Sequence, residues 1–193
     1  VLDQRLELLG QLFGERVESI RQRSLLLTAW APTGFDTLLI VENQDSFLRL
    51  VEQTPAATAL LFSAGFRASA GRIASASTRF AFLPGSDAEH FHRHWQHTAA
   101  GSFFWGDLDY AGMDILRALR STLPGLQAWQ PGYQPMLDAL LAGQGHTPEQ
   151  AAKERQLDPG LSGCTYADQQ LLPALRQQGR FLDQEGFMPA RLD

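Results

Sequence analysis

Three acidic side chains that could hold a metal ion follow two apolar segments of the chain. Glu42 ends the segment TLLIVE, and Asp107 and Asp109 follow the segment SFFWG. Residues two apart in an extended chain point to the same side, so the two aspartates can converge. Carboxylates held close together raise one another's pKa values, and a divalent cation relieves this repulsion. Because all-oxygen ligands favour Mg²⁺ or Mn²⁺ over zinc, the pattern predicts a site for one of these two ions.

A site of this kind is typical of phosphoryl transfer. A bound Mg²⁺ ion usually keeps several water ligands and is coordinated by both protein carboxylates and substrate phosphates. The ion would stabilise the leaving oxygen, and it would either activate a water or polarise the phosphorus. We therefore expect the three acids to act on a phosphate ester. Gly112 stands where the chain must turn tightly into the helix behind Asp109.

The elements around these acids alternate between strands and helices. Short apolar runs with little alternation predict strands buried on both faces, at 37–42, 59–62 and 102–106. Weaker strand signals cover 79–83 and 126–129, and 25–30 fits either a strand or a turn of helix. Helices are predicted at 45–51, 86–98 and 113–123. This order predicts an α/β fold with a mainly parallel sheet flanked by helices, which binds ligands at the carboxyl ends of its strands.

The rest of the chain is predicted to be helical. An N-terminal segment, 1–34, has apolar residues at helical spacing over 2–20 and should pack on a catalytic core spanning 35–130. The remaining 131–193 form a helical C-terminal extension, with helices at 134–141, 148–156 and 166–178 and a flexible loop at 143–146. A chain of 193 residues fits one compact unit. Because it opens with Val rather than Met, we expect it to be a fragment of a longer protein.

Composition narrows the possible functions. The 16 Lys and Arg residues against 21 Asp and Glu give a net charge of −5, which argues against nucleic-acid binding by bulk charge alone. A single cysteine, Cys164, allows neither an intrachain disulfide nor a cysteine-based zinc site, and it fits a cytoplasmic protein. No apolar run approaches the roughly 18 residues that a membrane span needs.

The acidic segments resemble a Toprim domain, the Rossmann-like fold shared by topoisomerases, bacterial primases and OLD-family nucleases. The resemblance rests on Leu38–Asn43, on Gly65 and on Gly106–Gly112, and it covers about half of the chain, residues 37–129. A closer resemblance is carried by IVENQDSFLRL, LFSAGF and FFWGDLDYAGMDILRALR. These runs are similar to the C-terminal region of the Wadjet nuclease subunit JetD and to the MksG proteins of bacterial condensin systems. That region is itself related to the catalytic subunit of topoisomerase VI, and Phe181–Glu185 resembles the segment that closes it.

The resemblance implies a DNA endonuclease that partners an SMC or condensin-type complex in defence against plasmids. Carried over residue by residue, it assigns metal binding to four acids: Glu42, Asp107, Asp109 and Glu185. Glu42 would also serve as general acid or base, and Gly65 and Gly112 would shape the backbone around the site. The kinship with topoisomerases also implies a homodimer, because paired cuts need paired sites.

Two other function classes stay open. One is a non-catalytic module that docks on DNA or on a protein partner and carries a degenerate acidic site. The other is a phosphatase of the haloacid dehalogenase type, which also ends a strand in Asp-x-Asp but normally continues with Thr or Val rather than Tyr110. We expect Tyr110 to pack or to position the loop, so that water rather than tyrosine attacks the phosphorus.

Basic side chains outside the acidic segments are candidates for DNA contacts. Arg67, Arg72 and Arg79 follow the second strand on the side of the sheet where the acids should lie, and they either grip phosphates or are ordinary exposed arginines. A histidine-rich segment, EHFHRHWQH, places His90, His94 and His97 on one helix face. We interpret that face as solvated or DNA-facing, with a transition-metal site as the alternative.

Overall fold

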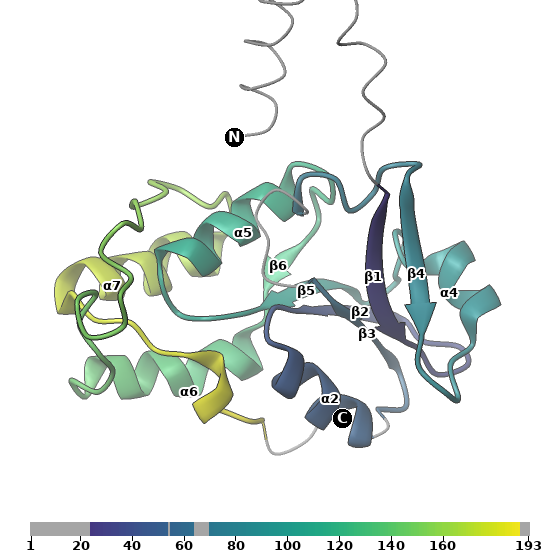
Figure 1. Ribbon diagram of the computed structural model, residues 1–193, viewed down its shortest axis with the longest axis horizontal. Helices are drawn as coiled ribbons and strands as arrows, with labels where there is room; N and C mark the ends of the chain where they lie inside the picture. Colours follow the sequence, from purple (N-terminus) through teal and green to yellow (C-terminus); the bar gives the residue numbers. More distant parts are fainter. Residues whose placement is uncertain (1–23, 54, 64–69, 190–193) are drawn as a thin grey trace, which may run out of the picture.

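One mixed sheet of six strands organises the computed structural model, which describes residues 24–53, 55–63 and 70–189 (Figure 1). The strand order is β4-β1-β3-β2-β5-β6. The strands are β1 (Leu25–Trp30), β2 (Thr37–Val41), β3 (Thr58–Phe62), β4 (Thr78–Phe82), β5 (Gly101–Trp105) and β6 (Gln127–Ala128). The helices are α2 (Gln44–Glu52), α4 (Ala88–His94), α5 (Tyr110–Arg120), α6 (Gln130–Leu141) and α7 (Leu172–Gln178), with a π-helical turn η2 (Ala167–Leu171) and a 3₁₀ turn η3 (Gln184–Gly186).

The sheet is parallel except where β1 pairs with β3. In its centre, β2 pairs with β3 on one side and β5 on the other, and Val41 lies opposite Trp105. Residues 25–30 thus form a strand and not a turn of helix, the two structures that the sequence allowed. This α/β arrangement agrees with the predicted fold class and is consistent with a Rossmann-like Toprim fold.

Helices cover both faces of the sheet, with α2 and α5 on opposite sides (Figure 1). The side chains of Leu38–Val41 are fully buried because β2 is covered on both faces. The helical C-terminal extension is confirmed in α6, η2 and α7, and α7 packs against α6 and α5. The predicted helix over 2–20 lies outside the described residues.

Several element boundaries differ from the prediction for local reasons. Helix α4 begins after Asp87, whose Oδ1 accepts a hydrogen bond from the His90 N–H at 2.9 Å, and it ends at His94 rather than at residue 98. Helix α5 begins at Tyr110, three residues before the predicted start, because the Asp109 carboxylate caps it. The loop predicted to be flexible at 143–146 is held at one end, since His146 and Phe181 exchange two backbone hydrogen bonds.

The prediction of a helix at 148–156 is wrong. Most of these residues form turns, and Ala152 adopts a left-handed backbone with φ +53°. The segment TPEQAAKER contains good helix formers, but propensity is a weak preference that tertiary contacts override. Here the competing contacts are ion pairs of the Lys153 side chain, which are described below.

Close packing between α6 and β5 depends on Gly132. A Cβ at this position would lie 2.6 Å from a ring atom of Trp129 and 2.8 Å from ring atoms of Trp105. Both indoles are buried, and their rings meet edge to face with centroids 5.5 Å apart. The aromatic rings cannot move aside cheaply, because interiors are packed at crystal-like density.

We therefore expect Gly132→Ala to lower the free energy of unfolding by about 1–3 kcal/mol, as overpacked cores do. The matched control is Gly125→Ala, because a Cβ at Gly125 would meet no atom within 4 Å. That control should stay within about 0.5 kcal/mol of the starting protein. Urea denaturation followed by tryptophan fluorescence measures both values, and equal stability of the two variants would contradict the packing argument.

Candidate active site

The parallel pairing of β2 with β5 brings Glu42 to the Asp-x-Asp segment. The Glu42 N–H donates to the Trp105 carbonyl at 3.0 Å, and Glu42 Oε2 accepts from the Asp107 N–H at 3.1 Å. Gly106 makes this approach possible, because a Cβ there would lie 2.1 Å from Glu42 Oε2. The structure thus brings together the acids that end these neighbouring strands.

Each aspartate is held by a backbone N–H from a different element. Asp107 Oδ1 accepts from the Gln184 N–H in η3 at 2.8 Å. Asp109 Oδ1 accepts from the Gly112 N–H at 2.8 Å and so caps α5. Asp109 is only 1% exposed. A Cβ at Gly112 would lie 2.2 Å from the Asp107 carbonyl oxygen, so only glycine fits this close approach.

A lysine that sequence reasoning missed lies among these carboxylates. Lys153 Nζ donates to Asp107 Oδ2 at 3.1 Å, to Asp109 Oδ2 at 2.9 Å and to Asp183 Oδ1 at 2.8 Å. Gln156 Nε2 also donates to Asp109 Oδ2, at 2.8 Å. The available signal was that Lys153 is the only lysine in a chain whose other basic residues are arginines. The ammonium group thus neutralises part of the acidic cluster.

The cluster raises the pKa values of three of its members, Glu42, Asp107 and Lys153. Burial, followed by repulsion from Asp107 and Asp109, raises the pKa of Glu42 to about 8. Burial also raises the pKa of Asp107, although the Gln184 N–H and Lys153 oppose this change. Burial alone would lower the pKa of Lys153, but its carboxylate partners raise it above the ordinary value. Glu42 therefore keeps its proton near neutral pH, while Lys153 stays charged.

The donor set suits a hard cation, but the side chains as arranged hold an ammonium group. Within the described ranges, no three His, Cys, Asp or Glu side chains form a ready group for a metal ion. Glu42, Asp107 and Asp109 nevertheless offer only carboxylate oxygens, which are the ligands that Mg²⁺ and Mn²⁺ prefer. These residues fit such an ion once Lys153 withdraws from Asp107 and Asp109.

Glu185, predicted as a fourth acidic contributor, makes a different contact. Its exposed side chain accepts a hydrogen bond at Oε1 from Asn43 Nδ2 at 2.6 Å. Asp183, two residues earlier, is the acid of this segment that contacts Lys153. Burial would raise the pKa of Asp183, but Lys153 and His146 together hold it below its ordinary value. The closing segment therefore reaches the site through a different acid.

Of the arginines expected to contact DNA, Arg79 does not lie beside the acids. Arg79 is on the edge strand β4, which β1 and β3 separate from β2, and its guanidinium donates to the carbonyls of Ala76 and Thr78 at 2.8 and 3.0 Å. Arg72 lies in the turns before β4, where its carbonyl accepts from the Thr78 hydroxyl. Gly65 and Arg67 lie outside the described residues.

The histidine-rich segment packs on aromatic rings. The His90 and His94 rings are 4.3 Å apart between centroids, and His90 meets the edge of Phe35. His97 lies beyond the end of α4, so it does not continue their helical face. Tyr110 also packs, edge to face on Phe181 with centroids 5.3 Å apart. The described geometry gives the histidine segment no metal-binding group.

Comparison with known proteins identifies the family. A family model described as the C-terminal part of the Wadjet protein JetD matches residues 5–187. The chain belongs to this family. A search of the curated proteins found no match. Membership associates the chain with the Wadjet system, and the matched range includes every residue of the acidic cluster. Of the helices in 24–53, 55–63 and 70–189, none is long and apolar enough to cross a membrane.

The raised pKa of Glu42 makes stability depend on pH in metal-free buffer. The folded chain keeps this proton up to about pH 8, whereas the unfolded chain releases it near 4.5. The stabilising contribution is thus complete below pH 4.5 and is lost as pH rises toward 8. Each unit of pKa difference corresponds to about 1.4 kcal/mol, so the free energy of unfolding should fall by a few kcal/mol between pH 5 and 8.5.

Glu42→Gln should flatten this slope, because the amide cannot ionise. Asp138→Asn is the control, since Asp138 lies on α6 and contacts Gln134 rather than the cluster. Urea titrations at several pH values, with a chelator present, measure the slopes of all three proteins. A slope in Glu42→Gln as steep as that of the starting chain would contradict the assignment.

Proposed function

We propose that this chain is a Toprim-type nuclease domain that cleaves DNA phosphodiester bonds with Mg²⁺ or Mn²⁺. The observation that carries the proposal is the convergence of Glu42, Asp107 and Asp109 at the carboxyl ends of two neighbouring parallel strands. Open α/β sheets bind ligands at that edge. Family membership supports the same conclusion, because the match covers both acidic segments.

Each acid of the cluster has a separate part in the proposed chemistry. Asp107 and Asp109 would hold the divalent cation together with Glu42, and the bound ion would supply charge stabilisation at the leaving oxygen. The backbone N–H groups of Gln184 and Gly112, which donate to Asp107 and Asp109, fix these side chains independently of the ion. Glu42, whose pKa is about 8 in the metal-free cluster, is suited to exchange a proton near neutral pH. Water is the proposed nucleophile, since Tyr110 packs on Phe181.

The proposed partners are DNA, an SMC or condensin-type complex and a second copy of the chain. Membership of the JetD family supports a role as a component of the Wadjet system. Paired DNA cuts would need two acidic clusters, and this is the reason to propose a homodimer. Size-exclusion chromatography with light scattering tests the homodimer, and a strictly monomeric result would remove it from the proposal.

A second candidate function is a non-catalytic module that docks on DNA or on a protein partner. Lys153 favours this alternative, because its ammonium occupies the carboxylates that a metal would need. The two candidates differ in whether the acidic cluster binds Mn²⁺. Divalent-metal binding therefore decides between them before any cleavage assay.

Glu42→Gln and Asp107→Asn should each reduce Mn²⁺-dependent nicking of supercoiled plasmid by about 100-fold or more, because each removes a charge from the ion's ligands. Asp138→Asn should cleave at the original rate. Circular dichroism checks that the variants keep their fold, and Mn²⁺ electron paramagnetic resonance measures binding in parallel. Full activity in both cluster variants would sink the nuclease assignment. A starting chain that neither binds Mn²⁺ nor nicks DNA would favour the docking module.

A further inference from the structure

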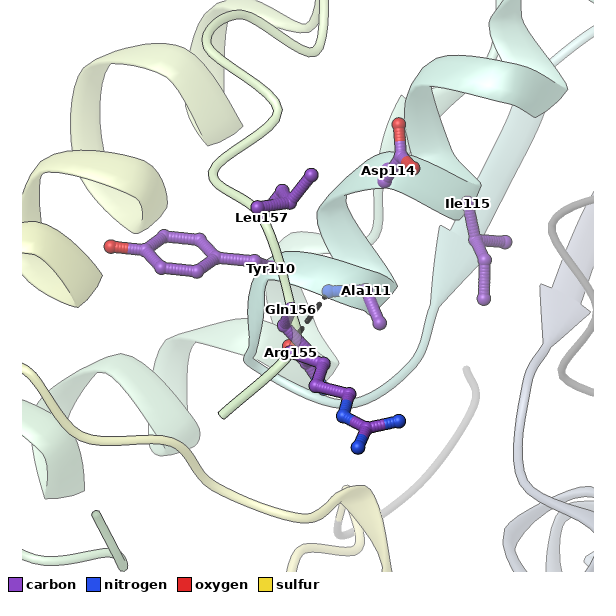
Figure 2. A pocket seen from close by; sticks show the side chains of 7 residues that line it. All are labelled: Tyr110, Ala111, Asp114, Ile115, Arg155, Gln156 and Leu157. Carbon is purple, nitrogen blue, oxygen red and sulfur yellow. Dashed lines mark hydrogen bonds between the residues drawn. The ribbon is translucent and has the colours of Figure 1, made fainter. Parts of the chain in front are cut away.

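A segment without helix or strand crosses the acidic cluster. We call residues 147–160 the strap; it consists of turns and irregular backbone between α6 and η2. Figure 2 shows its residues Arg155, Gln156 and Leu157 beside the first turn of α5. A cavity of about 210 Å³ lies between this part of the strap and α5. The strap therefore leaves open space between its residues 155–157 and α5.

The strap is held to the site by polar contacts. Lys153 bonds to three carboxylates at 2.8–3.1 Å. Gln156 bridges the site to α5, because its Nε2 donates to Asp109 and its Oε1 accepts from the Ala111 N–H at 3.0 Å, a bond drawn in Figure 2. Leu157, the only large apolar side chain of the strap, is 84% exposed and adds little burial. Two arginines bind the C-terminal end of the strap: Arg176 pairs with Asp158, and Arg117 donates to the Pro159 carbonyl.

The backbone next to Lys153 is strained. Ala152, with φ +53°, is the sole non-glycine residue with positive φ in the part of the chain that the structure describes. A side chain in this conformation is disfavoured, and it persists only where neighbouring contacts hold it. The next residue in the chain is Lys153, and its ion pairs are such contacts. The strained backbone at Ala152 thus favours release of the strap from the acidic cluster, and the ion pairs of Lys153 oppose that release.

Lys153 and a divalent ion would compete for the same carboxylate oxygens. Lys153 Nζ lies 2.9 Å from Asp109 Oδ2 and 3.1 Å from Asp107 Oδ2. A Mg²⁺ ion would approach these oxygens to 2.0–2.1 Å. The two cations would then lie within a few ångströms of each other and would repel each other at this partly buried site. Each cation therefore weakens the binding of the other.

We propose that Lys153 is an internal cation that competes with the divalent metal, and that the strap is a latch which must lift before the metal binds. The proposal rests on the proposed function, since it assumes that Glu42, Asp107 and Asp109 form the metal site. It adds that Lys153, while its ammonium donates to Asp107 and Asp109, offsets part of the repulsion between their carboxylates.

The test is the affinity for Mn²⁺, measured by electron paramagnetic resonance on the whole chain. Lys153→Met removes the competing charge and should bind Mn²⁺ at least about 10-fold more tightly than the starting chain. Arg155→Met is the matched control, because it removes a neighbouring exposed charge of the strap that makes no contact with the cluster in the described structure, and its affinity should not change. Gln156→Ala should tighten binding by a few-fold and covers the case in which Lys153→Met fails to fold.

A second measurement reports on the strap itself. Hydrogen exchange of the Lys153 N–H, which is bonded to the Pro148 carbonyl, and of the Ala111 N–H should accelerate when Mn²⁺ binds. Equal Mn²⁺ affinity in the starting chain and Lys153→Met, with binding still lost in Glu42→Gln, would overturn the latch and leave the metal site standing. Absence of Mn²⁺ binding in every variant would overturn both the latch and the proposed function.

Discussion

The parallel pairing of β2 with β5 is the constraint on which the rest of the site depends. It places Glu42 beside Asp107, and Asp109 follows with almost no exposure. Such a concentration of negative charge is unfavourable unless protons, cations or N–H donors offset it. Two of these devices are visible, because Glu42 retains a proton up to about pH 8 and Lys153 contributes one positive charge. With Asp183 included, this one ammonium donates to three aspartate side chains.

Backbone N–H groups supply the third device, and they also orient the carboxylates. The donors are the N–H groups of Asp107, Gly112 and Gln184, at 2.8–3.1 Å from their oxygens. Hydrogen bonds to a charged acceptor are stronger than neutral ones, and these donors belong to backbone that the fold fixes. The glycines at 106 and 112 allow the close approaches on which two of these bonds depend. The oxygens are therefore held in place by the fold itself, independently of any ion.

Local patterns in the sequence predicted the strands and the three acids, because each depends on a short run of neighbouring residues. Buried strands read as apolar runs, and an acid at a strand end needs no knowledge of distant segments. Lys153 and Asp183 could not be predicted in this way, since they reach the cluster from 46 and 76 residues beyond Asp107. The segment around Lys153 also carried a misleading signal: its helix formers predicted a helix, and ion pairs with distant carboxylates prevailed. The family resemblance indicated Glu185, in the right segment but two residues from the acid that meets Lys153.

The closing segment shows why the C-terminal extension belongs to the site. Leu182 pairs with Leu108 between the two aspartates, and Gln184 joins the ends of both acidic strands. The backbone N–H of Gln184 donates to Asp107, while its side-chain Oε1 accepts from the Asn43 N–H at 3.1 Å. Phe181, a few residues earlier, pairs with His146 immediately before the strap. One short segment thus contacts both acidic strand ends and His146, the residue immediately before the strap.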